Sequence, residues 1–539
     1  MTLLLLALAC DPATSKPDPS DDTGTTPTDG GGVGDGGGAD GGTETLDGGT
    51  ETVPPPVPSL AAVGGSLVLD PLRGLPGVWS AEVADWSEGL TVDLVLRDGV
   101  GDSLVVLAED LPVGAEARVE YEWDLRDGDG VALPVGSYSL EWTLSDPAGE
   151  PIDLLDAPFQ VVRTGVLTGV WGGSGSVDDV RVPLLWHRAS GASSTWDDGA
   201  EESAFQLDAI LTGEGADELP TQVPAVWESL RTPPTGWTDT NLPQGYAYDS
   251  RPTLRLSLGN SLGEAASLPW EARIDGWEVV AGSVAEGTIS FRKTEALAER
   301  LGVVEGELSL VLSVEGEDVS TQALPYRVYA LMGPATFSSS SAPHLAWVEA
   351  IDGALRGMAE AEATDEAVLD ALIEWIFLDL GLRYDTRSGA SYYMSYSGWS
   401  SGRFSFSSFL DRTNGSTINC SDCSGIAGVY ANMLGVPLDY AIILSNFQLN
   451  EIEAIGVGSF TSCPFGPTSC GFSYHAVTTN DDGESIWDAT LALDGDKDPG
   501  SEPSTRLFVQ DIDGEEYLDR LVRSGSASYY YADSRVRIR

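Results

Sequence analysis

Alternating apolar and polar positions dominate the chain from residue 58 to about residue 335 and predict short β-strands. Runs such as 90–96 (LTVDLVL) and 137–144 (SYSLEWTL) place apolar side chains at every second position, between Gly- and Asp-rich turns. This period is typical of a strand with one buried face. Four more runs continue the pattern: 180–186, 252–258, 287–292 and 307–314. We therefore predict β-sandwich modules over 58–164 and 165–335.

The apolar spacing changes near residue 336 to that of amphipathic helices. Segments 345–361 and 365–380 carry apolar residues three and four positions apart, and Thr364 precedes the second segment as an N-cap. Strand patterns return after residue 438. This mixture predicts a separate α+β domain over 336–539.

The first module contains a turn with a clear local signal. Asp127-Gly128-Asp129-Gly130 predicts a tight hairpin turn, and Gly136 is expected to start the next strand. Together with the preceding run YEWDL, this pattern resembles the Ig-like module of flagellar hook-capping proteins and its relatives on secreted bacterial enzymes. The resemblance implies an Ig-like spacer or binding unit.

Residues 1–10 have the pattern of an export signal. A short apolar run ends in Ala7-Leu8-Ala9-Cys10, which resembles the lipobox of bacterial lipoproteins, where the cysteine is diacylated and becomes the new N-terminus. The run is too short to span a membrane, which fits a cleaved signal. We expect a protein of the bacterial cell envelope that is anchored by lipid at Cys10.

Residues 11–57 consist almost entirely of Asp, Gly, Thr and Pro. With so few apolar residues, the segment cannot bury enough surface to offset the conformational entropy that it would lose on folding. It is therefore predicted to be a disordered acidic linker.

The chain is strongly acidic, with 84 Asp and Glu against 28 Lys and Arg and a formal charge of −56. Nucleic-acid binding needs a basic surface, so the charge argues against it. The acids favour either a solvated surface suited to high salt or calcium binding. Asp494, Asp496 and Asp498 alternate as in a calcium loop, but the following Gly500 falls one place late and the twelfth position lacks an acid. An acidic turn and a calcium site are both open there, and no other cofactor is expected.

Nucleophilic chemistry is indicated in one place, where Cys420 follows Asn419 at the start of the predicted helix 420–434. Free backbone N–H groups and the helix dipole favour a thiolate at that position. The chain contains three histidines, at 187, 344 and 475, and His475 lies on a predicted strand, 473–479. Its partner strand, 484–490, carries Asp488.

A four-residue turn at 480–483 would pair Thr479 with Glu484 and therefore His475 with Asp488. Directly opposed residues lie on one face about 5 Å apart at Cβ, so the carboxylate could orient the imidazole. The expected triad is Cys420 as nucleophile, His475 as base and Asp488 as orienting carboxylate.

This region resembles the transglutaminase-like (papain-related) cysteine superfamily over roughly residues 345–500. The matching features are Cys420, the Gly-Val-Pro fifteen residues later, the pair His475-Ala476 and the run Trp487-Asp488-Ala489-Thr490. The resemblance implies an α+β fold in which these three residues catalyse acyl transfer.

Other interpretations of the cysteines remain open. Cys420 and Cys423 at a helix start could form a thioredoxin-type redox pair. Cys463 and Cys470 are expected to form a disulfide in an oxidising compartment, which is favoured over zinc binding by the four cysteines.

The sequence therefore predicts a multidomain, lipid-anchored enzyme that attacks a peptide or carboxamide carbonyl of a protein or peptide substrate. Hydrolysis and amine transfer share the same thioester, so the residues do not separate them. The alternative is a catalytically inactive transglutaminase-like scaffold or binding protein.

Overall fold

The structure is a computed structural model of the whole chain, which divides into two units, Met1–Pro56 and Val57–Arg539. The residues that it describes are 56–72, 76–127, 130–171, 180–187, 192–193, 204–206, 244–337, 345–358, 361–396, 402–480, 483–495, 505–531 and 535–538. Cys10, residues 11–55 of the predicted linker, Asp496 and Asp498 lie outside them. The helices and strands described all belong to the second unit.

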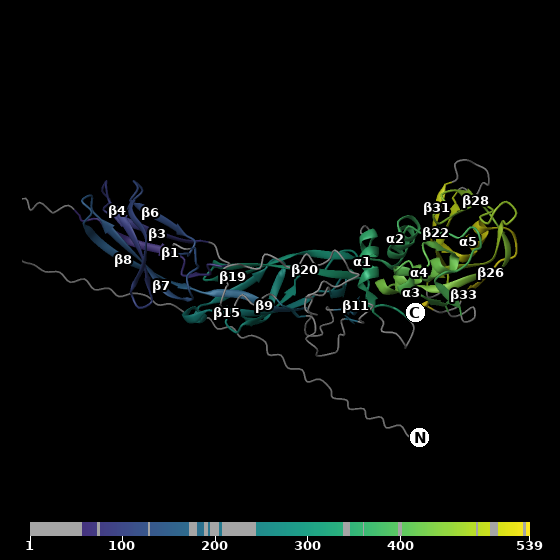
Figure 1. Ribbon diagram of the computed structural model, residues 1–539, viewed down its shortest axis with the longest axis horizontal. Coiled ribbons are helices and arrows are strands. Elements are labelled where there is room, and N and C mark those ends of the chain that lie inside the picture. The colour runs from purple at the N-terminus through teal and green to yellow at the C-terminus, as the bar shows by residue number, and fades with distance from the viewer. Residues whose placement is uncertain are drawn as a thin grey trace, which may run out of the picture. The chain divides into compact units, whose positions relative to one another are not determined.

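The described part of this unit is built mostly of strands, which form several sheets (Figure 1). The first two sheets have the orders β1-β3-β6 and β2-β8-β7-β4-β5. Their strands are β1 Ser59–Gly65, β2 Val68–Leu69, β3 Gly77–Ala84, β4 Thr91–Asp98, β5 Ser103–Pro112, β6 Arg118–Trp123, β7 Gly136–Ser145 and β8 Pro151–Val161.

Apolar side chains from both sheets meet in one core. Trp79 of β3 lies with its ring 5.3 Å from that of Phe159 of β8, and both side chains are buried. The alternation predicted for 90–96 and 137–144 is present as β4 and β7, and β7 begins at Gly136. The apolar positions of β4, which are Val92, Leu94 and Leu96, are all buried, as a strand with one face on the core requires.

A second pair of sheets has the orders β10-β14-β20-β19-β16 and β13-β9-β15-β18-β17. Their strands are β9 Arg163–Trp171, β10 Arg181–Val182, β13 Ala204–Gln206, β14 Gln244–Ala247, β15 Thr253–Ser261, β16 Trp270–Ile274, β17 Trp277–Ser283, β18 Thr288–Lys293, β19 Gly302–Val314 and β20 Glu317–Leu331. The long hairpin β19–β20 turns at Glu315 and Gly316, both with positive φ, as a two-residue turn between twisted strands requires. Its buried residues share one core with β15 and β18.

Helices enter after residue 345. They are α1 Val348–Gly357, α2 Asp365–Leu378, α3 Phe406–Leu410, α4 Cys420–Leu434 and α5 Gly514–Leu521. They accompany an eight-stranded sheet in which β28-β27-β30-β29-β26-β32 form a path, while β31 pairs with β30 and β33 pairs with β26. The strands are β26 Asp439–Leu449, β27 Ile452–Ala454, β28 Phe460–Thr461, β29 Gly471–Thr479, β30 Ser485–Asp494, β31 Arg506–Asp513, β32 Val522–Gly525 and β33 Ser528–Tyr531.

Short strands complete the second unit. They are β11 Leu184–His187, β12 Ala192–Ser193, β21 Ala346–Trp347, β22 Arg383–Tyr384, β23 Met394–Tyr396, β24 Gly402–Phe404, β25 Thr417–Ile418 and β34 Arg537–Ile538. β22 pairs in parallel with β25, directly ahead of α4.

The predicted starts of the helices at residues 365 and 420 are confirmed. The first helix begins at Val348 and not at residue 345, because Ala346–Trp347 forms strand β21, which pairs with β11. Thr364 caps α2 by accepting a hydrogen bond from the Ala367 N–H at 3.2 Å. α4 begins at Cys420 and ends at Gly435, whose φ of 91° is accessible to glycine. A Cβ at Gly435 would lie 2.5 Å from the backbone of Gly333.

All fifteen residues of α4 are buried, so this helix has no solvent-exposed face. The helix packs against α1, α2, β29 and β30, so solvent reaches no side of it freely. This burial explains its small and apolar composition: Gly425, for example, lies so close to Phe404 that an added Cβ would stand 2.7 Å from that ring.

Asn432 provides a test of this packing. Its fully buried amide donates to the carbonyls of Gly428 and Leu438 at 2.5 and 3.0 Å and accepts from the Thr336 hydroxyl at 2.6 Å. Asn432→Ala should lower the free energy of unfolding by about 2–3 kcal/mol, because buried partners lose their hydrogen bonds. Asn414 is exposed and serves as the control: Asn414→Ala should change the value by about 0.5 kcal/mol or less. Urea unfolding measures both, and equal losses would contradict the assignment.

Candidate active site

Cys420 is the first residue of α4, and its position follows from local capping. The Asn419 side chain accepts from the Asp422 N–H at 3.0 Å, while the Asp422 carboxylate accepts from the Asn419 N–H at 3.3 Å. This reciprocal pair is a capping box, which fixes where the helix starts. The Cys420 side chain is free of disulfide bonding, and the residue is only 3% exposed.

His475 and Asp488 lie on the adjacent strands β29 and β30, but their predicted register was wrong by two residues. Thr479 pairs with Ile486 and Thr478 with Trp487, so His475 and Asp488 are not directly opposed. The reason lies in Asn480, whose side chain accepts from the N–H groups of Glu484 and Ser485 and moves the turn one residue along the chain.

A two-residue shift keeps side chains on the same face of a sheet, so the contact survives on the diagonal. His475 Nε2 lies 2.7 Å from Asp488 Oδ2. Both side chains are essentially removed from solvent.

Asp488 is held by two further hydrogen bonds. The hydroxyl of Tyr517 donates to Oδ2 at 2.7 Å, and the N–H of Thr490 donates to Oδ1 at 2.7 Å. Hydrogen-bond donors interact favourably with a negative charge. These two groups therefore compensate for the removal of the Asp488 side chain from water.

The pKa of His475 is shifted by opposing effects. Burial lowers it, but the charge and hydrogen bond of Asp488 and the neighbouring Cys420 outweigh burial and raise the pKa to about 10. Within the described residues, Nδ1 has no hydrogen-bond partner of regular geometry. The raised pKa favours the imidazolium form of His475 at neutral pH.

Phe472 fixes the plane of the imidazole. Its ring stacks on that of His475 with centroids 5.1 Å apart and an interplanar angle of 7°. The two residues are three positions apart on β29, so the same strand supplies the imidazole and the ring that stacks on it.

Tyr517 is a functional candidate that the sequence pattern did not indicate. It lies on the two-turn helix α5, is fully buried, and has a pKa raised well above its usual value by burial and by Asp488. The residue therefore stays a phenol that donates to the carboxylate. No local motif marks it, because its contact with Asp488 spans 29 residues.

Cys420 opens into a cavity of about 610 Å³. One wall is the loop from Tyr384 to Gly389, and another contains Phe465 and Cys470. The chain leaves the first wall after Gly389 and forms β23, β24 and α3 before it reaches α4.

The structure contains a disulfide between Cys463 and Cys470, which closes the second wall into a small loop. Phe465 within that loop packs edge-on against Phe472, 5.7 Å away. The loop is therefore attached to the same aromatic ring that stacks on the base.

Buried polar side chains tie the first wall to the helix that carries Cys420. Asp422 accepts from the N–H groups of Tyr392, Tyr393 and Met394 at 2.7–2.9 Å. Asn419 Nδ2 donates to the carbonyl of Gly389 at 3.0 Å. The loop and the thiol consequently keep a fixed relationship.

Cys423 does not share the environment of Cys420. Burial raises the pKa of its thiol well above the usual value, despite a hydrogen bond with Thr490, and the side chain has no exposure. A redox pair needs an accessible thiol with a low pKa. Of these two thiols, Cys420 lines the cavity and Cys423 does not.

The calcium candidates are not brought together within the described residues. Asp494 ends β30, whereas Asp496 and Asp498 lie outside the description. Among the residues described, His, Cys, Asp and Glu form no group that could hold a metal ion. None of the helices described is both long and apolar enough to cross a membrane.

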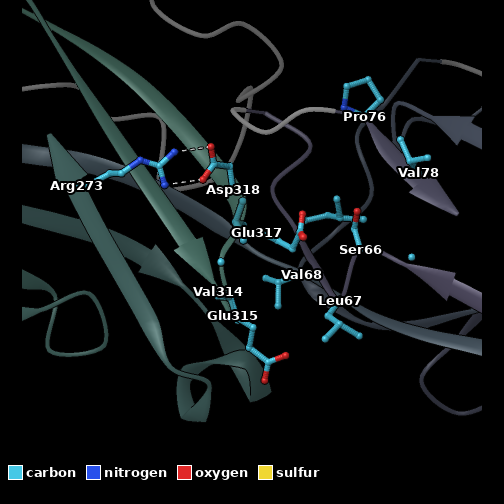
Figure 2. A pocket seen from close by; sticks show the side chains of 14 residues that line it. Ser66, Leu67, Val68, Pro76, Val78, Arg273, Val314, Glu315, Glu317 and Asp318 are labelled. Carbon is cyan, nitrogen blue, oxygen red and sulfur yellow. Dashed lines mark hydrogen bonds and ion pairs between the residues drawn. The ribbon is translucent and has the colours of Figure 1, made fainter. Parts of the chain in front are cut away.

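Figure 2 shows a second hollow, of about 830 Å³, lined by residues of β2 and of the β19–β20 turn. Arg273 donates two hydrogen bonds of 2.7 Å to Asp318 there. The described residues that line this hollow include neither histidine nor cysteine, so they offer no thiol or imidazole like those of Cys420 and His475.

No protein-family model and no curated protein matches the chain. Solved structures that resemble it include a β-glucuronidase of Bifidobacterium dentium, with 18% identity over 20% of this chain and 19% of that chain and a TM-score of 0.15. PorZ, a surface component of the type-IX secretion system of Porphyromonas gingivalis, gives 18% identity over 19% and 11%, with a TM-score of 0.13.

The fibronectin(III)-like modules of CbhA from Clostridium thermocellum give 12% identity over 52% of this chain and 99% of that chain, with a TM-score of 0.18. The chain covers less than a fifth of the first two structures. Scores this low carry no argument about fold or function.

The pKa of His475 can be tested with Asp488→Asn. Without the carboxylate, burial dominates and should bring the pKa below the ordinary value of about 6.5. With only three histidines in the chain, ring proton resonances followed by NMR from pH 5 to 11 can resolve this shift.

The raised pKa of His475 should also make the free energy of unfolding depend on pH. The folded pKa lies above the unfolded one, so the stabilisation is complete below about pH 6.5 and is lost as the pH rises through about 10. Asp488→Asn should remove this dependence, whereas Asp494→Asn on the same strand should retain it. An unchanged His475 titration in Asp488→Asn would disprove the assignment.

Proposed function

We propose that the chain is an exported, lipid-anchored cysteine acyl-transfer enzyme that acts on peptide or carboxamide bonds. Cys420 is the nucleophile, His475 is the general acid and base, and Asp488 orients the imidazole. The domain that carries them, over residues 336–539, is proposed to be transglutaminase-like.

One observation carries this proposal: a thiol at a helix start lines a cavity and acts on the pKa of a buried histidine that is hydrogen-bonded to a carboxylate, and the three residues come from three different elements. A histidine with a purely structural role needs no neighbouring thiol that opens into a cavity. The Tyr517 hydroxyl and the Phe472 ring add support, because they restrain the two partners in one orientation.

The chemistry follows from these positions. The Cys420 thiolate attacks the carbonyl carbon, and the imidazolium of His475 gives its proton to the departing amine. A thioester with the acyl group remains. The neutral imidazole then takes a proton from water or from a second amine as that group attacks the thioester. This step breaks the carbon–sulfur bond, releases an acid or a new amide, and restores the thiolate and the imidazolium.

The order of reactivity among the cysteines tests this function. Iodoacetamide at neutral pH should modify Cys420 first, and His475→Ala should slow the modification by roughly a hundredfold, the range of a lost acid–base partner. Mass spectrometry of proteolytic peptides measures both.

Cys423→Ala is the matched control and should leave the rate of Cys420 labelling close to that of the wild type, since Cys423 is sealed in the core. Equal labelling of Cys420 and Cys423, or indifference to the histidine substitution, would favour the inactive scaffold. A reversible Cys420–Cys423 disulfide with reductase activity would favour the redox interpretation.

The membrane anchor is proposed from Cys10 and residues 11–57. A flexible chain of that length has a mean reach of roughly 35–40 Å, so the folded unit would act within a thin layer above the membrane.

Cys10→Ala should move the protein from the membrane to the soluble fraction without changing its activity on a small soluble substrate, because the lipid serves only to retain it. Fractionation and labelling with radioactive palmitate check this. A variant that still sediments with membranes, or a wild type without label, would remove the lipoprotein assignment.

A further inference from the structure

The charge of the Cys420 cavity differs from that of the chain. Acids outnumber bases by 84 to 28 overall, yet the described residues that line the cavity include no Asp or Glu. They include one charged residue, Arg387. The remainder are aromatic, glycine, cysteine, hydroxyl and amide residues, so the positive charge stands without an opposing acid in the lining.

Arg387 is presented by a rigid loop. The carboxylate of Asp385 accepts from the N–H groups of Arg387, Ser388 and Ala390 at 3.0–3.3 Å, and from the hydroxyl of Tyr392 at 3.1 Å. Burial raises the pKa of Asp385, but the hydrogen bonds from the loop outweigh it and lower the pKa below its usual range. The Asp385 carboxylate therefore binds mainly the backbone N–H groups of the loop.

The Arg387 side chain itself remains available. The residue is exposed, and within the described part of the chain no acid forms an ion pair with its guanidinium. Arg506, by contrast, binds Glu453 through two hydrogen bonds of 2.6 and 2.8 Å.

We propose that Arg387 binds a carboxylate of the substrate, so that the enzyme prefers acyl donors with an acidic group close to the carbonyl that Cys420 attacks. This inference rests on the proposed function and adds the substrate class, an anionic peptide. The planar guanidinium can donate two parallel hydrogen bonds to a carboxylate, which fixes orientation as well as charge.

The rest of the lining fits such a peptide. The amides of Asn446 and Gln448 and the hydroxyls of Thr468 and Ser473 offer neutral hydrogen bonds to a peptide backbone. Tyr384 and Phe465 supply an apolar surface, and their rings lie 5.9 Å apart. The acidic surface elsewhere on the chain repels an anionic ligand, whereas Arg387 attracts it. The cavity is therefore expected to bind anionic ligands that the rest of the surface rejects.

The test uses paired electrophiles that label Cys420. Peptidyl chloromethyl ketones are made as pairs that differ in one residue, Glu or Gln, at each of the three positions nearest the reactive carbon. Second-order labelling rates are measured on the full chain. At one of these positions the wild type should react about tenfold faster with Glu than with Gln, as expected for a partly exposed charged hydrogen bond.

Arg387→Gln should bring that ratio close to one, and Arg387→Glu should invert it. Raising the salt concentration should reduce the wild-type ratio, because solvent ions screen an exposed pair. Arg383→Gln is the control: this arginine is also exposed and four residues away, but it does not line the cavity, so the wild-type ratio should persist.

The outcomes distinguish failure of the carboxylate site from failure of the proposed function. Equal labelling by both members of every pair, or a preference that survives Arg387→Gln, overturns the carboxylate site and leaves the proposed function intact. A wild type in which no probe labels Cys420 overturns both.

Discussion

The pairing of His475 with Asp488 is the constraint on which the site depends. Neither group tolerates burial as a lone charge, since desolvation penalises each of them severely. Together, with Tyr517 and the Thr490 N–H completing the coordination of the carboxylate, they form a polar group within an apolar core. Strands β29 and β30 carry the two residues, α5 supplies the Tyr517 hydroxyl, and the Phe472 ring stacks on the imidazole. Together these elements hold the pair in position.

A second buried carboxylate has a different task. Asp422 belongs to the helix that presents the thiol and also accepts hydrogen bonds from the N–H groups of residues 392–394, which follow the loop that forms a cavity wall. Helix capping and loop placement thus depend on the same side chain. The thiol, the wall and the base are held through buried hydrogen bonds, which suits a site where small displacements cost reactivity.

Local signals in the sequence were sufficient for several of the elements and placed Cys420, His475 and Asp488 on the helix and the two strands that carry them. Asn419 and Thr364 indicated helix starts, and alternation indicated β4 and β7, because each of these depends on neighbours in the chain. The hairpin register was wrong because the Asn480 side chain competes for backbone donors within the turn, an effect that turn length alone does not contain.

Long-range contacts were beyond that reasoning. Tyr517 meets Asp488 across 29 residues, and the burial of α4 on every side results from elements that precede and follow it. A periodic stripe reports the face that a helix must bury; it does not report how many neighbours the fold will supply.

The four cysteines of the folded unit exist in two oxidation states a short distance apart along the chain. Cys463 and Cys470 are oxidised to each other and shape a wall of the cavity, while Cys420 and Cys423 remain thiols. The wall is therefore complete only where disulfides form, and the proposed nucleophile would have to survive in that same environment. Because Cys420 is only 3% exposed, oxidants as well as solvent have little access to its sulfur, so conditions that close the wall would leave the proposed reactive thiol intact.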